Sequence, residues 1–559
     1  MTARRPLPWL LLGVVMAASA VLLMYAGRET TFFYDDWPYV LDRGAWSLDT
    51  FLEPHNEHLQ AVSVLIYKVL FETVGLHDYG VYRFALVVLD LLCGVLLFVY
   101  ARGRVGTWPA LGLAACLVVM AASWYNLVYA FQVNFVGAMA AGLGALLCFD
   151  RGGRRWDALG SALLCVSIAS SSVGFPFLIG AVVEVLWRPD RWRRLWVAGV
   201  PVVLYGLWMV AYGDGGSARA SNLDAVPDYV VDGYDDSVAA ITGLTVEFGV
   251  VVAFALVVLV TRELLAFPRV DARLAAVVVM PLSFWALTAL GRADMGVEAD
   301  ANRYLYASGL FVALAAVEAL RHYALSGRLA VIVGVLLGFG FLHNASGVEQ
   351  GGDILRTWSG SGKDAATALD IAGPSLVPPW YADADPTQGF IEARRYFAAV
   401  RRYGSSPGFT LEELAGASEE RRAGTDDKLL RVLQFGVGSV KPGHPTSAEA
   451  PEVAASEGGA VSAAGRGCLR FVPAPGVEEG GSWVEVVSPA DGSGTFVRAR
   501  SAPVELRLRR FASGFPEAAK QTIVPGSSGG WVLPRDRAAS IPWRAQLRGT
   551  APFLVCASD

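Results

Sequence analysis

Long apolar runs constrain this chain more than any other feature of its sequence. A helix of about 20 apolar residues crosses the hydrocarbon core of a membrane. Runs of that kind recur through roughly the first two thirds of the 559 residues, and only 17% of all residues are charged. The sequence therefore predicts an α-helical polytopic membrane protein with an outer C-terminal domain. We expect about 11 spans, at 8–26, 80–100, 108–127, 131–149, 157–171, 174–187, 193–212, 239–261, 272–290, 303–321 and 328–344.

The arginines predict how these spans are oriented. Cytoplasmic loops carry an excess of Lys and Arg, and alternate loops of this sequence are rich and poor in arginine, beginning with Arg4 and Arg5. We expect a protein of the cytoplasmic membrane with its N-terminus inside and the part after residue 344 outside. Residues 1–26 also suit a cleaved signal peptide, and the arginine pattern fits either alternative.

An acidic pair follows the first apolar run. Residues 30–40 read TTFFYDDWPYV, so that Asp35 and Asp36 are adjacent and flanked by aromatic residues. Burial beside a second carboxylate raises the pKa of one member of such a pair, which strengthens it as a general base. The alternative is that Asp35 caps the next helix and Asp36 is solvated.

A second polar cluster, HNEH at 55–58, precedes a helical pattern over residues 59–73. This pattern predicts a helix that lies in the membrane interface. Three roles are open for His55, Glu57 and His58. They could line a substrate pocket, bind a divalent metal, or cap that helix. The spacing differs from the HExxH zinc motif, so we predict no metal ligands but leave a divalent metal open.

The anatomy of the first half resembles the GT-C superfamily of integral-membrane glycosyltransferases. YDDW, NEHLQAVSVLIYKVLF and GLHDYGVYRFALVVLDLLCGVLLF carry the resemblance, which is best over residues 8–150. The superfamily includes protein O-mannosyltransferases, aminoarabinose transferases and arabinosyltransferases. ASSSVGFPFLIGAVVEVLWRPDRWRRLW and ANRYLYASGLF look like segments of actinobacterial membrane proteins of this type.

The resemblance implies an activity and its partners. Such enzymes pass a sugar from a polyprenyl-phosphate carrier to an acceptor outside the cytoplasmic membrane, here a cell-envelope glycan, lipid or protein, and they work among membrane lipids. An acidic residue of the first outer loop acts as general base or holds a metal, which points to Asp35 or Asp36. The second outer loop, WYNLVYAFQVNF, offers Gln132 and Asn134 but no carboxylate, which puts a two-carboxylate metal site in doubt.

The donor phosphate needs cations at the outer face. Arg303 begins a predicted span, Arg292 ends the preceding one, and Arg83 lies near the start of the second span. Guanidinium groups bind phosphate bidentately. These arginines could instead anchor helix ends or pair with nearby acids. We expect the substrate site to include His55, Glu57, His58, Gln132, Asn134 and Tyr304.

The C-terminal part divides into three. Residues 345–441 are mixed, with amphipathic helical stretches, and residues 442–467 predict a low-complexity linker. From Cys468 onward, seven short β patterns separated by Gly, Pro and Ser predict a small β-sandwich. Cys468 and Cys556 lie on its first and last strands, so a disulfide outside the cell would join the two.

Two classes of function remain open in the sequence. The first is the glycosyltransferase; the second is a non-catalytic transporter or assembly subunit for lipid-linked glycans. A transporter would favour inverted repeats, and we find no internal repeat in the sequence. A net charge of −5 without a Lys/Arg patch argues against nucleic acid as a partner.

Overall fold

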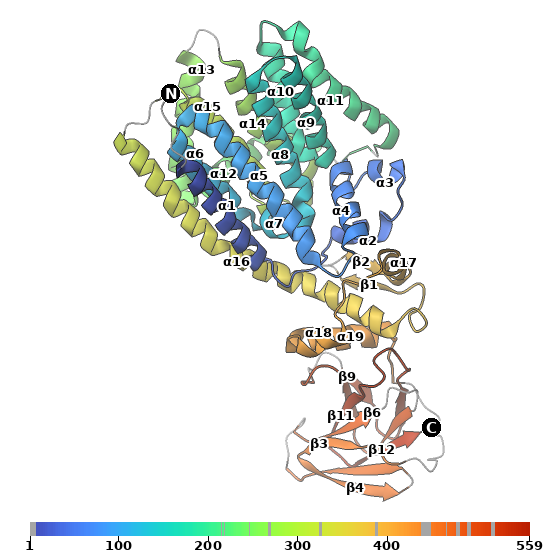
Figure 1. Cartoon of the computed structure of the whole chain (residues 1–559). Helices are drawn as coiled ribbons and strands as arrows, with labels where there is room; N and C mark the ends of the chain where they lie inside the picture. Colours follow the sequence, from blue (N-terminus) through green and yellow to red (C-terminus); the bar gives the residue numbers. More distant parts are fainter. Residues whose placement is uncertain are drawn as a thin grey trace. The chain divides into compact units, whose positions relative to one another are not determined.

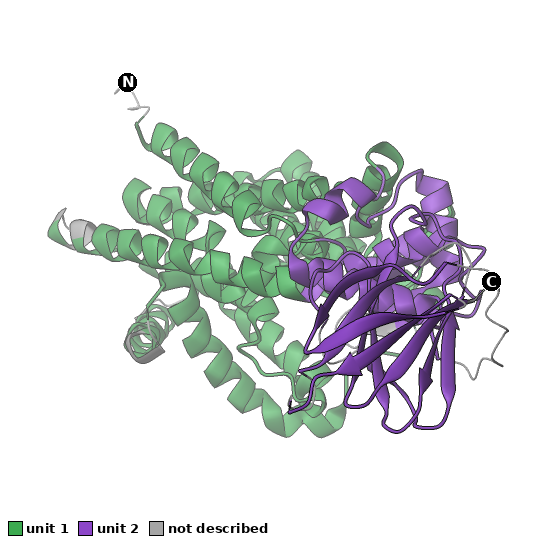
Figure 2. Ribbon diagram, turned by 90° about the horizontal axis from the view of Figure 1, so that it is seen from below, with its two compact units in different colours: residues 1–30, 43–74, 78–357 green, residues 31–42, 75–77, 358–559 purple. Residues whose placement is uncertain are grey.

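The structure, a computed structural model, consists of two units (Figure 2). Residues 1–30, 43–74 and 78–357 form the helical unit, and residues 31–42, 75–77 and 358–559 form the C-terminal unit. The residues described are 7–213, 215–216, 218–244, 246–266, 270–323, 327–385, 389–437, 449–465, 467–476, 481–488, 494–515 and 520–558.

The helical unit is a bundle of apolar helices (Figure 1). In chain order they are α1 (Leu7–Ala26), α3 (Leu48–Leu52), α4 (Ala61–Thr73), α5 (Tyr79–Val105), α6 (Thr107–Val118), α7 (Trp124–Val128), α8 (Val133–Arg151), α9 (Arg154–Ser170), α10 (Phe175–Trp187), α11 (Arg191–Tyr212), α12 (Val226–Thr242), α13 (Val246–Ala266), α14 (Ala272–Arg292), α15 (Asn302–Leu320) and α16 (Gly327–Ala372).

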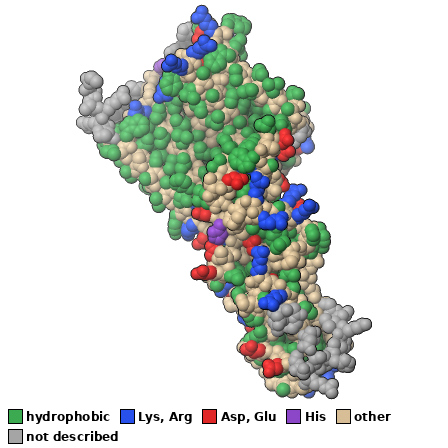
Figure 3. Space-filling view, turned by 45° about the vertical axis from the view of Figure 1, so that its right-hand side comes forward, with side chains coloured by type: hydrophobic (Ala, Val, Ile, Leu, Met, Phe, Trp, Pro, Cys, Tyr) green, Lys and Arg blue, Asp and Glu red, His purple; other side chains and the backbone are tan. Residues whose placement is uncertain are grey.

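Among the described residues, eight helical segments are long and apolar enough to cross a membrane. They include α1, α5, α11 and α15, so the chain is a multi-pass α-helical membrane protein. Apolar side chains cover much of the face of the bundle that Figure 3 shows. The exposed large apolar side chains of the bundle include Val203, Leu207 and Val210 of α11. These side chains suit contact with lipid tails.

Not every predicted span is one long helix in the described part of the chain. The predicted spans at 157–171 and 174–187 are the shorter helices α9 and α10. The predicted span at 239–261 is not one helix, because α12 ends at Thr242 and Gly243 follows with φ of 65°. A glycine in this left-handed conformation is a usual C-terminal cap of a helix.

Small residues let the helices pack closely. A Cβ atom on Gly142 of α8 would lie 2.1 Å from the ring of Phe177 on α10, and one on Gly180 would lie 2.3 Å from the side chain of Met280 on α14. Both positions therefore require glycine. Close approach through small residues is a common mode of helix packing in membranes.

Helix α16 extends far beyond the predicted span at 328–344. It has 46 residues and continues to Ala372 in the C-terminal unit. No proline interrupts it, and the first breakers are Gly373, with φ of 71°, and Pro374. The predicted boundary at residue 345 is therefore a change of composition within one helix.

The C-terminal unit combines short helices with a β-sandwich. Its helices are α2 (Asp36–Asp42), α17 (Ala393–Tyr403), α18 (Leu411–Gly416) and α19 (Glu419–Val432), and β1 (Ala382–Asp385) pairs with β2 (Gly389–Glu392). The sandwich strands are β3 (Val453–Glu457), β4 (Gly459–Gly465), β5 (Cys468–Pro473), β6 (Trp483–Ser488), β7 (Gly494–Ala499), β8 (Val504–Arg509), β9 (Lys520–Ile523), β10 (Ser528–Val532), β11 (Trp543–Gly549) and β12 (Phe553–Ser558).

The sandwich has two five-stranded antiparallel sheets, in the orders β10-β7-β12-β5-β4 and β3-β6-β11-β8-β9. All seven predicted strand patterns form strands. Cys468 and Cys556 face each other on the neighbouring strands β5 and β12 and are joined by a disulfide.

Two further strands lie where the sequence predicted a linker. Strands β3 and β4 fall within residues 442–467 and join the sheets through backbone pairing with β6 and β5. Their Ala, Ser and Gly side chains give little hydrophobic pattern, and Gly458, with φ of 63°, makes the turn between them. Backbone pairing, which side-chain composition does not reveal, decides their structure.

Candidate functional site

The two ends of the helical bundle differ in their charged groups. At the arginine-rich end, where α5 and α8 end, arginines pair with carboxylates. Arg273 lies 2.8 Å from both Glu184 and Asp150, and Arg104 lies 2.9 Å from Asp150. Segments expected on the inner side thus come together, and Arg273 and Arg104 are paired with carboxylates there.

The other end, here called the first-loop end, is covered by residues 43–74. The indole of Trp208, near the end of α11, donates to the carbonyl oxygen of Leu52 at 2.7 Å. The hydroxyl of Ser63 donates to the backbone carbonyl oxygen of Ser170 at 3.3 Å. The first loop is therefore attached to the ends of α9 and α11. This is the end of the bundle that carries the predicted binding residues of the helical unit.

Two buried cations hold the first loop in shape. The guanidinium of Arg43 donates to the carbonyl oxygens of Thr50, Glu53 and Pro54 at 2.9, 3.2 and 3.0 Å. The ammonium of Lys68 on α4 donates to the carbonyl oxygen of Arg43 at 2.9 Å. Both satisfy carbonyl groups that the irregular loop would leave without partners, so the loop is a fixed support.

The HNEH cluster forms a tight two-residue turn. The backbone groups of His55 and His58 exchange two hydrogen bonds of 3.0 Å. Asn56 and Glu57 at its centre have φ of 47° and 69°, the left-handed pair that a type I′ turn requires. Glycine is usual there, and strain at non-glycine residues is concentrated at functional sites.

His58 lies in a positively charged environment. Its pKa is lowered to about 4, first by burial and then by Arg292, with smaller effects from His55 and Arg303, while Glu57 opposes the shift. Two of the three arginines predicted as phosphate ligands, Arg292 and Arg303, therefore lie within electrostatic range of the HNEH turn.

Arg292 and Arg303 are partly exposed and carry uncompensated charge. Neither makes an ion pair within the part of the chain that the structure describes. The side chain of Arg303 lies over the ring of Tyr304, with 5.0 Å from the guanidinium carbon to the ring centroid. Of the acids that the sequence offered as partners, Asp294 pairs with Arg219 instead.

Gln132 and Asn134 lie at the start of α8, beneath the turn. Both side chains are buried. The amide oxygen of Gln132 accepts a hydrogen bond of 2.9 Å from Asn126, and that of Asn134 accepts one of 2.6 Å from the backbone of Phe135. Phe131 packs against the ring of His55 at 5.4 Å, so this segment adjoins the HNEH turn.

Arg83 occupies a different place from the other two arginines. Its guanidinium is buried and donates to the carbonyl oxygens of Leu23 and Met24 at 3.2 and 2.5 Å. These are carbonyl groups of the last turn of α1, and that of Leu23 also accepts from the backbone N–H of Gly27 at 3.2 Å. Arg83 therefore joins α5 to α1, and its predicted phosphate role stays a prediction.

Asp35 and Asp36 belong to the C-terminal unit and differ from each other. Asp36 is fully buried, and its carboxylate accepts a 2.9 Å hydrogen bond from the backbone of Phe33. Asp35 is partly exposed, after Tyr34 with φ of 37°. The alternative in which Asp36 is solvated is therefore wrong, and Asp35 is the member of the pair that a substrate can reach.

No group of three or more His, Cys, Asp and Glu side chains placed to hold a metal occurs within the described ranges. The two histidines of the HNEH turn are neighbours, but the structure brings no third such ligand to them. The first-loop end thus holds Arg292 and Arg303 within electrostatic range of His58, together with the acid Glu57, and the two cations can bind an anionic ligand.

Sequence analysis missed two polar contacts of the bundle. The hydroxyl of Tyr306 on α15 donates at 2.7 Å to the carboxyl group of Asp90, which is fully buried within α5. Near the first-loop end, Tyr229 of α12 lies within electrostatic range of Arg303 and Tyr304. The charged Asp90 within an apolar span was a signal for the first contact; we see no sequence signal for the second.

Neither a protein-family model nor a curated protein matches the chain. Among solved structures, it is similar to the crystal structure of ArnT from Cupriavidus metallidurans bound to undecaprenyl phosphate. The two are 14% identical with a TM-score of 0.44, over 69% of this chain and 84% of that one. A likeness of this size does not assign an activity to the chain.

Proposed function

We propose that this protein is a glycosyltransferase that moves a sugar from a polyprenyl-phosphate carrier to a cell-envelope acceptor outside the cytoplasmic membrane. One observation carries the proposal: Arg292 and Arg303 lack carboxylate partners among the described residues and lie close enough to His58 to lower its pKa. Arginines without a carboxylate partner at the end of an apolar bundle can bind the phosphate of a lipid. The tail of that lipid can lie along the helices.

The reaction needs charge stabilisation on the leaving side. As the bond between the sugar carbon and the phosphate oxygen breaks, negative charge grows on the phosphate. Guanidinium groups fixed beside it stabilise that charge. His58 is neutral at pH 7 because its pKa is about 4, so it serves as a hydrogen-bonding group for the sugar.

The acceptor side needs a base. As the acceptor oxygen bonds to the sugar carbon, its proton must leave, and a carboxylate within hydrogen-bond reach can take it. We assign this role to Asp35, because it is partly exposed. Asp36 would shape the loop through its bond to Phe33. Within the helical unit, the turn at 55–58 and the amides of Gln132 and Asn134 would form the binding surface for the sugar.

Binding of a synthetic polyprenyl-phosphate sugar to the detergent-solubilised protein tests the proposal. Arg303→Ala should weaken binding about ten-fold, or about 1.4 kcal/mol. Arg303→Lys should weaken it less, because charge remains while the planar fork is lost. Arg28→Ala is the control, since Arg28 already pairs with Glu349 at 3.3 Å.

Two outcomes would contradict these assignments. Parent-like affinity in Arg303→Ala would move the phosphate role to Arg292. No binding to the parent protein at all would reject the transferase. Binding without transfer to any envelope acceptor would instead favour a carrier or assembly subunit for lipid-linked glycans.

A further inference from the structure

Two aromatic side chains are strongly exposed on the surface of the C-terminal unit. Trp380 and Phe390 are 71% and 72% exposed, more than any other large apolar side chain in the described part of this unit. Phe390 lies in β2, where its neighbour Ile391 is buried opposite Asp383 of β1. Since successive side chains of a strand point to opposite faces, Phe390 lies on the outward face of the β1–β2 hairpin. Exposed apolar groups of this size mark a contact with a membrane or another molecule.

Helix α17, which follows the hairpin directly, adds positive charge. It contains no acidic residue and four exposed arginines, Arg394, Arg395, Arg401 and Arg402. Arg395 pairs with Asp42 and Glu392. Arg394 and Arg401 make no ion pair with any residue in the described ranges. Because residues at i and i+7 share a face of a helix, these two arginines lie on the same side of α17.

The aromatic and the positive groups are neighbours. The backbone N–H of Ala393 donates to the carbonyl oxygen of Tyr381 at 2.9 Å, which continues the pairing of β1 with β2 into the first residue of α17. Trp380 and Arg394 are the next residues on the two segments, so they lie at the same end of the hairpin. Trp380, Phe390 and the arginines of α17 thus make up one surface, here called the hairpin–α17 surface.

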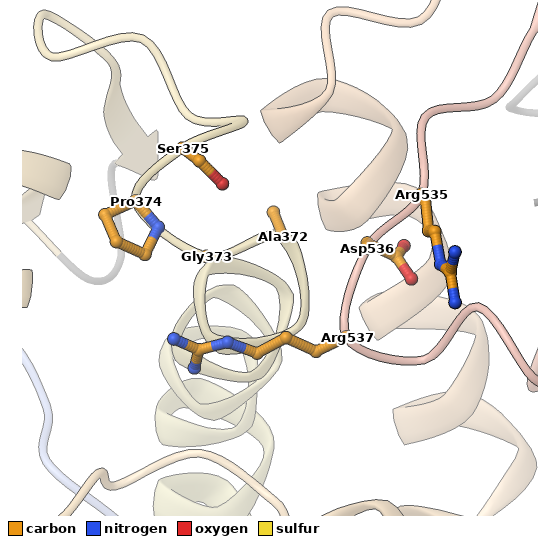
Figure 4. A pocket seen from close by; sticks show the side chains of 7 residues that line it. All are labelled: Ala372, Gly373, Pro374, Ser375, Arg535, Asp536 and Arg537. Atoms are coloured by element: carbon orange, nitrogen blue, oxygen red, sulfur yellow. The ribbon is translucent and has the colours of Figure 1, made fainter. Parts of the chain in front are cut away.

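This surface is held in place from within the unit. The opposite face of α17 is buried, and the hydroxyl of its Tyr396 donates to the carboxyl group of Asp370 on α16 at 3.0 Å. The hairpin is held by Asp383, which lies 2.6 Å from the ammonium of Lys428 on α19. Figure 4 shows the side chain of Arg537 across the end of α16, beside a pocket of about 430 Å³, and this side chain donates to the carbonyl oxygen of Asp370 at 3.2 Å. The surface therefore exists before any partner binds.

The chain itself ties this surface to a membrane-crossing helix. The backbone N–H of Leu76 donates at 2.7 Å to the hydroxyl oxygen of Ser405, which follows the end of α17. Leu76 also precedes α5, which begins at Tyr79 and is long and apolar enough to cross a membrane. The extended chain from Leu76 to Tyr79 spans at most about 10 Å. Its connectivity therefore keeps the end of α17 close to the start of that span.

We propose that the hairpin–α17 surface docks on the headgroups of a membrane that contains anionic phospholipids. Aromatic side chains are favoured at the boundary between membrane and water, and arginines are attracted to anionic headgroups. An amphipathic helix with a basic face, next to exposed aromatic residues, is typical of segments that lie on a membrane. The inference concerns contact with lipid alone and does not depend on the transfer reaction.

The test uses the full-length protein in lipid nanodiscs, with a fluorescent dye on Ala398→Cys. Ala398 is an exposed residue of α17 between Arg394 and Arg401, so the substitution leaves the aromatic residues and the arginines in place. A phospholipid with a nitroxide on its headgroup quenches the dye only where the two come close. In nanodiscs with phosphatidylglycerol, we expect at least about two-fold stronger quenching for Ala398→Cys than for Ala455→Cys, an exposed residue of β3. The parent protein, treated with the same dye, gives the background of its own cysteines.

The role of charge is tested in the same labelled protein. Arg394→Gln together with Arg401→Gln should lower the quenching to the level seen in phosphatidylcholine alone. Salt at about 1 M, where the screening length is about 3 Å, should do the same. Arg470→Gln together with Arg500→Gln, at exposed arginines of the β-sandwich, is the matched control and should change nothing. Since Arg394 and Arg401 make no ion pair among the described residues, their double variant should keep the parent's melting temperature.

Three results would overturn the proposal. Quenching could be equal at the two labelled positions, or it could be the same with and without phosphatidylglycerol. The lipid could also fail to quench the dye on Ala398→Cys while polygalacturonate or a higher protein concentration shields it from iodide, which would assign the surface to an acidic glycan or a second copy. Each of these results could occur while the protein still binds a polyprenyl-phosphate sugar, so failure here is distinguishable from failure of the transferase.

Discussion

The two ends of the helical unit use arginine in opposite ways. At the arginine-rich end, Arg273 is buried between Glu184 and Asp150. At the first-loop end, Arg292 and Arg303 have no carboxylate partner among the residues described, although Asp294 and two further acids are near in sequence. Arg273 and Arg104 are thus paired with carboxylates, whereas Arg292 and Arg303 are not paired among the described residues.

This difference separates arginines that stabilise the fold from arginines that are available to bind a ligand. A paired and buried guanidinium is part of the packing, and its loss leaves a carboxylate buried without a partner. Arg292 and Arg303, which have no carboxylate partner among the described residues, lower the pKa of His58. An anion from outside the chain would neutralise the positive charge of such a site. The comparison therefore predicts that substitutions at one end affect stability and those at the other affect binding.

The largest expected effect is on stability at the arginine-rich end. Arg273→Ala removes two ion pairs, with Glu184 and with Asp150, while Arg188 still pairs with Glu184 and Arg104 with Asp150. Breaking a buried ion pair costs up to about 3–5 kcal/mol, so the apparent melting temperature of the solubilised protein should fall. Arg303→Ala, in the same assay, should change it little. Equal melting of both variants and the parent would remove the distinction between the two ends.

The second expected effect concerns the acidic pair. Asp35→Asn should reduce transfer at least about 100-fold, which is typical for loss of a general base, while the fold survives. Asp36→Asn keeps an oxygen for the N–H of Phe33 and should retain most activity. Asp36→Ala should instead cost about 1–3 kcal/mol of stability, because that N–H loses its acceptor. Full activity of both Asn variants in a membrane transfer assay would exclude the pair from catalysis.

The smallest expected effect is a dependence of donor binding on pH. The pKa of His58 is lowered from its usual 6.5 to about 4. Its contribution to stability is therefore complete above pH 6.5 and is lost as the pH falls toward 4. A bound phosphate offsets the arginine charges and raises the pKa of His58. The affinity for the donor should therefore rise about five-fold as the pH is lowered from 7 to 5.

His58→Gln should abolish this rise in affinity. NMR titration of the histidines measures the pKa of His58 directly. Arg292→Gln should raise the pKa of His58 more than Arg303→Gln does, because Arg292 has the larger effect. An unshifted histidine pKa in the parent protein would show that the two arginines do not act on the HNEH turn.

Much of the architecture could be predicted from single segments. Apolar runs such as residues 80–100 form helices because lipid leaves the backbone no other way to satisfy its hydrogen bonds. Short alternating patterns such as WRAQLRG form strands at their predicted positions. The cysteines on the first and last predicted strands are joined by a disulfide. In each case the prediction needs only the residue pattern of one helix or strand, or the order of the elements along the chain.

Parts of the fold that depend on distant partners could not be predicted in this way. Strands β3 and β4 have almost no hydrophobic pattern and exist through pairing with β6 and β5. The turn at 55–58 holds Glu57 in a conformation that its side chain disfavours, because the fixed loop around it supplies the hydrogen bonds.

The sequence by itself determined that this chain crosses a membrane many times, carries an acidic pair after its first helix, and ends in a β-sandwich, because composition and short-range pattern decide these features. Only the tertiary structure decided what each charge does. Arg83 and Arg303 look alike in the sequence, yet Arg83 donates to carbonyl groups of α1 and Arg303 pairs with no carboxylate among the described residues. The role of a charge depends on which groups lie within a few ångströms of it, and residues far apart in the chain supply those groups.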